Sequence, residues 1–293
     1  MSNLFFSVVT QSLTFLPLSF AISISYTILR ATDMTLDGSF VLGAGIFALL
    51  ITQGCPPAIA GLAALLAGAL AGMMVSLIQR GGKVDPLLAG ILAYFILASA
   101  NLALMGRPNI NLLSVTTLVS HAFANSDLAG WILVAGYCAV ICIITGVLMS
   151  SRFGLTLRAL GDNPPLLQRL GKNIERYRLA GFALTNLLSA AAGCLTAQTV
   201  GYADIGMGFG MTLTGIGAII LGQQLLRFFI KKSSLRIVFE FSACLLGVLV
   251  YFFAINGLLR LDINPVYLKM VLGLVLIVFL RTAVNPTAVR NAS

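Results

Sequence analysis

Few side chains of this protein belong to types that carry out covalent chemistry. The sequence has one histidine, His121, and five cysteines, none of which forms a Cys-x-x-Cys pair. Cys138 and Cys142 share a helix face, but without partner ligands they are interpreted as small apolar packing residues. No metal site and no disulfide framework is predicted. The sequence also lacks the Gly-x-x-x-x-Gly-Lys-Ser/Thr phosphate loop, so it has no such device for binding ATP.

The nine acidic residues are the remaining candidates, and their chemistry would be proton or sodium coupling. Such coupling normally needs ionisable groups in the middle of a membrane span. Nearly all of the acids are expected at the ends of apolar segments, and the deepest is Glu240. Even Glu240 lies only about one turn from the Arg236 end of its segment. The sequence therefore gives poor support for ion coupling within this chain.

The composition excludes a soluble enzyme. Of the 293 residues, 59% are apolar and only 9% are charged, with a mean hydropathy of +1.00. A soluble chain has about 25% charged residues and does not expose that much apolar surface. The net charge of +9 comes from basic residues in short segments between apolar runs. This placement indicates orientation in a membrane and not a nucleic-acid partner.

The apolar runs predict an all-α integral membrane protein. A spanning helix needs about 20 apolar residues. Nine segments meet this requirement, at roughly 4–29, 36–53, 57–78, 86–105, 129–149, 179–199, 204–226, 235–256 and 265–280. With residues 150–178 in the cytoplasm, fifteen of the eighteen lysines and arginines lie on the cytoplasmic side. The amino terminus is then outside and the carboxyl terminus inside.

The nine segments are expected to form one transmembrane domain, 1–293, built from two repeats of opposite orientation. The first repeat covers about 4–105 and the second about 179–281, with a connecting helix at 129–149. Glycine-rich stretches interrupted by polar residues occur in both repeats, and the broken-helix positions are Asp37, Gly38, Ser39, Phe40, Gly206, Gly208, Phe209 and Gly210. Inverted repeats with broken helices are typical of transporters. The alternative is that the glycines only let helices pack closely, as in the pairs Gly68 with Gly72 and Gly206 with Gly210.

The segment 150–178 is too long and too patterned to be a simple turn. Asp162 or Asn163 is a good N-cap, and Pro164 suits the first position of a short helix. Leu166, Leu167 and Leu170 would share one face of that helix, and Gly171 would end it. So short a helix is unstable alone in water. We expect it to couple to a cytoplasmic ATPase by docking into a groove, the alternative being a helix that rests on lipid headgroups.

Four stretches carry a resemblance to a known family. They are Asp33-Met-Thr-Leu-Asp-Gly-Ser-Phe-Val-Leu-Gly-Ala44, Asp85-Pro-Leu-Leu-Ala-Gly-Ile-Leu92 with Met105-Gly-Arg-Pro-Asn-Ile110, Leu157-Arg-Ala-Leu-Gly-Asp-Asn-Pro164, and Gly201-Tyr-Ala-Asp-Ile-Gly-Met-Gly-Phe-Gly210. The chain resembles permease subunits of bacterial ABC importers in the branched-chain amino-acid and sugar permease superfamily. More narrowly, it is similar to the group of tryptophan or tyrosine transport permeases.

The resemblance implies a homodimer in the bacterial inner membrane, with two ATPase subunits below and an extracytoplasmic substrate-binding protein above. ATP and Mg would bind the ATPase, so this subunit would be non-catalytic and would carry no cofactor. The fourth helix would line the translocation path, through Tyr94, Ser99, Asn101 and Met105, and the path would continue to a gate near Arg107 and Asn109. The alternatives are that Asn101 bonds a neighbouring carbonyl and Arg107 anchors a helix end. Two interpretations are also open for Asp33 and Asp37: they contact the solute, or they cap the second helix.

The function predicted on this basis is ATP-driven import of a small polar or amphipathic solute by alternating access. An amino acid is the expected solute, with aromatic amino acids as the narrower candidates. A different class of function, an ion-coupled carrier that works without an ATPase, is the main alternative. A membrane subunit that only anchors other proteins is a weaker one.

Overall fold

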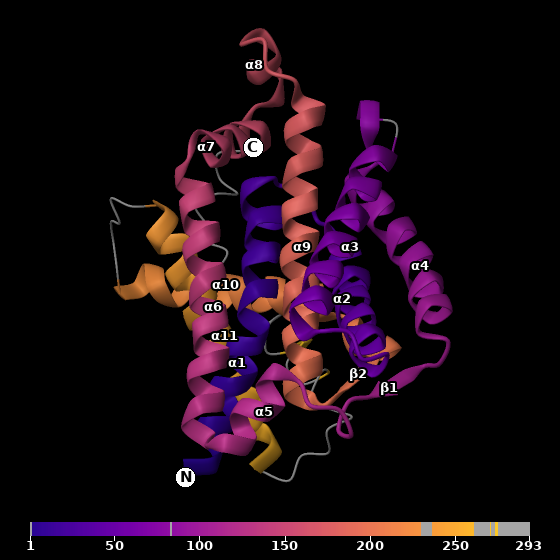
Figure 1. Cartoon of the computed structure of the whole chain (residues 1–293). Helices are drawn as coiled ribbons and strands as arrows, with labels where there is room; N and C mark the ends of the chain where they lie inside the picture. The colour runs from indigo at the N-terminus through magenta and orange to yellow at the C-terminus, as the bar shows by residue number, and fades with distance from the viewer. Residues whose placement is uncertain (1, 83, 230–235, 261–269, 271–272, 275–293) are drawn as a thin grey trace. The chain divides into compact units, whose positions relative to one another are not determined.

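In the computed structural model, the described residues are 2–82, 84–229, 236–260, 270 and 273–274. They fold almost entirely into helices (Figure 1). The α-helices are α1 (Ser2–Ile22), α2 (Thr35–Thr52), α3 (Pro57–Ile78), α4 (Pro86–Met105), α5 (Leu118–Asn125), α6 (Asp127–Ser150), α7 (Arg152–Asp162), α8 (Pro164–Arg169), α9 (Ile174–Val200), α10 (Met211–Phe229) and α11 (Arg236–Arg260). Shorter elements are the π-helix η1 (Ser23–Ile28), the 3-10 helices η2 (Arg80–Gly82) and η3 (Ile205–Gly208), and the strands β1 (Asn109–Asn111) and β2 (Tyr202–Asp204).

Eight helical segments are long and apolar enough to cross a membrane. They are Val8–Ile28, Thr35–Thr52, Pro57–Gly82, Pro86–Met105, Leu128–Ser150, Ile174–Val200, Ile205–Leu226 and Phe239–Arg260. Each corresponds to one of the nine predicted spans. The ninth prediction, 265–280, lies outside the described residues. The structure therefore confirms an all-α integral membrane protein.

The chain divides into two compact units, residues 13–216 and residues 1–12 with 217–293. Within the larger unit, α9 packs along α2 and α3, and α4 packs on α2 (Figure 1). The helices α2 and α9 are mostly buried, whereas α3, α4 and α6 expose many leucines and isoleucines. Such exposed apolar faces are expected of helices that contact lipid or another subunit.

Two glycines of α3 allow its close approach to α9. A Cβ atom on Gly68 would lie 2.5 Å from Cβ of Ala190, and one on Gly72 would collide with the carbonyl oxygen of Phe182. Small residues four apart let two backbones approach in this way. The interpretation of these glycines as packing residues is correct here.

In the smaller unit, α11 packs closely on the second half of α10. A Cβ on Gly222 would collide with the carbonyl of Ala243, and one on Gly247 with that of Ala218. In the same unit, the Asn256 amide donates a hydrogen bond of 3.0 Å to the Gln11 side chain. Small residues thus hold helices together in this unit as well.

The two short strands join the end of α4 to the end of α9. They pair antiparallel, with Asn109 opposite Asp204 and Ile110 opposite Ala203. Ile110 and Ala203 are fully buried, together with residues of the second half of α2. The chain that follows α4 is thereby attached to the chain that enters η3.

Residues 150–178 contain more regular structure than expected. The helices α7 and α8 occupy most of this segment; α7 lies beside the first turns of α9 and α8 lies beyond that end of α9 (Figure 1). The helix α9 begins at Ile174, five residues before the predicted start at 179. Asn173 caps it, since its side chain accepts a hydrogen bond from the backbone of Arg176 at 3.3 Å.

Candidate functional site: two helix interruptions and the short helix α8

The connection between η1 and α2 places Asp33 against the middle of α9. The Asp33 carboxylate accepts a 2.9 Å hydrogen bond from the Asn186 amide. Asn186 lies near the centre of α9, a helix of 27 residues and so about 40 Å long. Asp33 lies two residues before α2, at the end of an apolar segment as predicted, but the folded chain places it beside the centre of α9.

Asp33 and Asn186 belong to a buried polar network. The other oxygen of Asp33 accepts the Thr35 backbone N–H at 2.9 Å. The Ser39 hydroxyl donates to the Asn186 side chain at 2.6 Å, and the second amide hydrogen of Asn186 goes to the Phe182 carbonyl. Asp33, Ser39 and Asn186 are at most 1% exposed. A buried network is stable only when its members are satisfied in this way, and it then selects one arrangement of the helices.

Asp37 does not cap its own helix; its carboxylate caps α10. One oxygen accepts the Gly210 backbone N–H at 2.9 Å, and the other accepts both the backbone N–H and the hydroxyl of Thr212 at 2.6 Å. The first N–H groups of a helix lack partners within the helix, and the helix dipole favours a negative charge there. Asp33, in contrast, receives the Thr35 N–H at the start of α2, so the capping interpretation holds for Asp33 only.

The predicted broken-helix positions divide into two groups. The first group lies inside the continuous helix α2, so the prediction of a break there is wrong; the break precedes Thr35. This group is Asp37, Gly38, Ser39 and Phe40. Gly206 and Gly208 lie in η3, and the chain is interrupted at Phe209 and Gly210 before α10, as predicted. Gly210 has φ of +76°, which favours glycine. At Gly208, a Cβ would collide with the Asp37 carbonyl, so α2 and η3 are in close contact.

The predicted path residues of α4 lie on different faces. Asn101 and Met105 are buried. Asn101 donates a 3.1 Å hydrogen bond to the Gly38 carbonyl, as the alternative interpretation required, while its Oδ1 has no hydrogen-bond partner among the described residues. Ser99 is exposed beside Phe95 and Leu102, and Tyr94 is half-buried. The structure of one chain therefore does not bring these residues together.

Arg107 lies in the link between α4 and β1, Asn109 is the first residue of β1, and both are exposed. The Asn109 amide donates a 3.3 Å hydrogen bond to the Asp204 carboxylate across the strand pair. Asp204 also accepts the Gly206 backbone N–H at 2.7 Å, at the start of η3. These contacts attach the predicted gate region to the chain that leads into the interruption before α10.

The short helix α8 begins and ends where the sequence predicts. The Asn163 side chain accepts the Leu166 N–H at 3.3 Å, Pro164 takes the first helical position, and Gly171 has φ of +70°. Leu166 and Leu170 are 49% and 66% exposed, but Leu167 is only 4% exposed. The expectation that all three leucines face a partner is therefore wrong for Leu167, which packs inside its own chain.

An ion pair joins the end of α7, just before α8, to the connection before α2. Arg30 lies 2.5 Å from Asp162, the residue that precedes the Asn163 cap. Arg30 is also the one non-glycine residue with positive φ among the described residues, at 52°. Asp162 thus contacts the same short connection that carries Asp33 into the network with Asn186.

Two residues of the site, Asn186 and Thr212, were not among the candidates from sequence. The usable signal was a polar side chain in the interior of an apolar segment. Among the described residues, no cluster of three or more His, Cys, Asp or Glu side chains is placed to hold a metal ion. The site consists of helix interruptions held by carboxylates and amides.

Comparison with known proteins identifies the family. Residues 4–280 match the family described as branched-chain amino acid transport system, permease component. The chain belongs to this family. It is 34% identical over 276 residues to the tyrosine transport system permease protein of Clostridioides difficile, covering 94% of this chain and 90% of the relative. It is 43% identical over 278 residues to an uncharacterized protein of Rickettsia prowazekii, covering 95% and 97%, and 24% identical over 255 residues to the ribose import permease of Escherichia coli, covering 84% and 74%.

Family membership establishes several of the expectations from sequence. The chain is a permease subunit of an ABC transporter and a multi-pass protein of the inner membrane. It is non-catalytic, because ATP hydrolysis in these systems takes place on partner ATPases. The family associates with ATPase and substrate-binding partners. Membership decides against the ion-coupled carrier that works without an ATPase.

Proposed function

We propose that this permease imports an amino acid, and that aromatic amino acids are its substrates. The observation that carries the proposal is the full-length similarity to a permease named for tyrosine transport. Other relatives are named for ribose, nucleoside or autoinducer import, so the family as a whole transports chemically different solutes. The relative with the tyrosine name has higher identity and coverage than these.

The proposed architecture is two inverted repeats, about 4–105 and 179–281, joined through α6, with the amino terminus outside and the carboxyl terminus inside. Each repeat then has one interruption before a spanning helix, at 29–34 and at 205–210. The hydrogen bonds from Gly210 and Thr212 to Asp37 support this proposal, because they join the second interruption and the start of α10 to the first turn of α2, just after the first interruption. Movement of one repeat against the other would have to break or shift these contacts.

The proposed translocation path lies at the axis of a homodimer, lined by the exposed face of α4. Ser99 lies on that face with Phe95 and Leu102. The unpartnered Oδ1 of Asn101 is buried behind it, and a solute donor would satisfy this atom if α4 moved from α2. In this proposal, Arg107 and Asn109 form the outer gate.

The proposed coupling element is α8, through the exposed side chains of Leu166 and Leu170. ATP binding would close the ATPase pair and displace α8. The Arg30–Asp162 ion pair would carry this displacement to the connection that holds Asp33. In the proposed topology, α8 lies on the cytoplasmic side of the membrane, in the segment between the spanning helices α6 and α9.

The test is uptake of labelled amino acids by cells with and without the gene for this chain. We expect loss of high-affinity tyrosine, tryptophan or phenylalanine uptake in the deletion strain, restored by the intact gene. Uptake should stop when ATP is depleted while the ion gradients are maintained. Leucine and ribose are the control solutes, because the family is described by branched-chain amino-acid transport and includes a ribose import permease. Unchanged aromatic uptake together with lost leucine or ribose uptake would refute the proposed substrate.

A further inference from the structure

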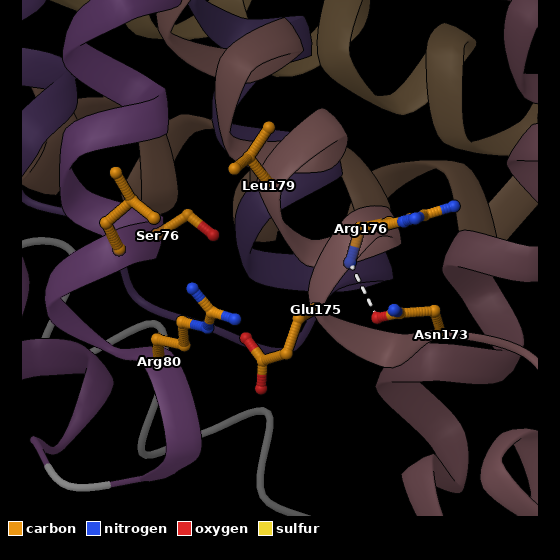
Figure 2. A pocket seen from close by; sticks show the side chains of 7 residues that line it. Ser76, Arg80, Asn173, Glu175, Arg176 and Leu179 are labelled. Atoms are coloured by element: carbon orange, nitrogen blue, oxygen red, sulfur yellow. Dashed lines mark hydrogen bonds between the residues drawn. The ribbon is translucent and has the colours of Figure 1, made fainter.

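A pocket of about 280 Å³ opens between the end of α3 and the beginning of α9. It is lined by Ser76, Leu77, Arg80, Asn173, Glu175, Arg176 and Leu179 (Figure 2). Both helices are candidate membrane spans, so their ends lie where the hydrocarbon region meets the lipid headgroups. The pocket is separate from the interrupted helices and from α8, and it has no role in the function proposed above.

Opposite charges face each other across this pocket. Figure 2 shows the Arg80 guanidinium on one wall and the Glu175 carboxylate on the other. Glu175 also has Arg178 at 3.7 Å on its own helix, whereas Arg80 has no ion pair among the described residues. The Arg176 side chain points away from the space between Arg80 and Glu175. The pocket therefore offers a cation and an anion to one ligand that carries both charges.

The apolar surface beside the pocket forms a stripe along α3. Leu66, Leu70 and Leu77 are 64%, 64% and 54% exposed. Spacings of four and seven residues place side chains on one face of a helix. Leu77 also lines the pocket, so the stripe begins where the charged walls end. A ligand with a zwitterionic head and apolar chains would match both parts.

We propose that this pocket binds the headgroup of phosphatidylethanolamine in the leaflet at this end of α3. The lipid phosphate accepts charge-assisted hydrogen bonds from Arg80, and the ethanolammonium donates to Glu175. The acyl chains lie on the leucine stripe. Phosphatidylcholine has the same charges but no N–H to donate, and phosphatidylglycerol has no cation for Glu175.

The experiment is native mass spectrometry of the purified full-length permease, in the complex that it forms, after removal of bound lipid. Phosphatidylethanolamine, phosphatidylcholine and phosphatidylglycerol with identical acyl chains are titrated separately. We expect at least about tenfold tighter binding of phosphatidylethanolamine, which is about 1.4 kcal/mol. Arg80→Gln should weaken the binding of all three lipids. Glu175→Gln should abolish the preference for phosphatidylethanolamine over phosphatidylcholine.

Arg152→Gln is the matched control, because it removes an exposed arginine at the start of α7. It should leave lipid binding unchanged, and Arg80→Lys should retain part of it. Equal binding of the three lipids by the intact protein would overturn the proposal. So would undiminished phosphatidylethanolamine binding by Arg80→Gln, or crosslinking of an Arg80→Cys variant to an acidic segment of a partner protein in place of lipid.

Discussion

The Asp37 carboxylate accepts both the backbone N–H and the hydroxyl of Thr212, although 175 positions separate the two residues in the sequence. The start of α10 is therefore capped by a residue from the first turn of α2. Asp37 is 7% exposed and Thr212 1%. Hydrogen bonds to a charged group contribute about 1.5–3 kcal/mol, more than neutral ones, and an unpaired buried donor is costly.

Removal of either partner should lower stability, and the two losses should not add. We expect Asp37→Ala to cost about 2–3 kcal/mol and Thr212→Val about 1 kcal/mol. The double variant should lose less than the sum of the two by about 1 kcal/mol, because both single changes break the same contact. Thermal unfolding of the purified protein in one detergent measures this. Strict additivity would show that the two side chains do not interact in the folded protein.

The Arg30–Asp162 pair should matter for coupling more than for stability. Both side chains are about half exposed, and exposed ion pairs contribute only about 0–1 kcal/mol. We expect Arg30→Glu and Asp162→Arg each to reduce uptake per ATP hydrolysed severalfold, while the amount of protein in the membrane stays close to normal. The exchanged pair, carrying both changes, should recover much of the coupling. No recovery would exclude a role for the attraction between the two charges.

Substitutions of the exposed leucines of α8 should affect binding of the ATPase, whereas substitution of the buried leucine should affect folding. Leu166→Asp with Leu170→Asp places charges on the exposed face, so we expect loss of the ATPase from the purified complex without loss of the permease. Leu167→Ala acts inside the chain and should instead destabilise it by about 2–5 kcal/mol. Leu113→Asp is the control, since Leu113 is 80% exposed and contacts Gly201 at the opposite end of α9. Full retention of the ATPase by the double aspartate variant would exclude α8 as the docking element.

Cysteine crosslinking tests the dimer axis. In a variant that lacks the five native cysteines, Ser99→Cys should form a disulfide between two copies on mild oxidation, because the exposed face of α4 would meet its equivalent at a twofold axis. Leu62→Cys on α3 is a matched exposed position and should crosslink poorly. Gel mobility without reductant gives the result. Equal crosslinking at both positions would argue against α4 at the axis.

The orientation is tested in the same cysteine-free background. A membrane-impermeant thiol reagent should label Leu113→Cys from outside the cell and Leu155→Cys only after the membrane is opened. Both side chains are well exposed, at 80% and 59%, so accessibility depends on which side of the membrane they occupy. The reverse pattern would place the amino terminus in the cytoplasm.

The sequence alone determined the class of protein, the eight described spans and the ends of α8. These features depend on local properties: apolar length against bilayer thickness, a side chain that caps the next turn, and a glycine with positive φ at position 171. Such preferences act over a few neighbouring residues, so they can be read before the chain is folded.

Only the tertiary structure decided where the first interruption lies and what holds both interruptions. Asp33 was expected at the end of a span because the residues around it are polar, yet it contacts Asn186 in the middle of α9. Leu167 was expected on the face of Leu166 and Leu170, yet it is buried. The partner of a buried carboxylate or leucine comes from a distant segment. Which segment is brought close depends on helix packing and on the need to satisfy buried polar groups, and neither can be read from the local sequence.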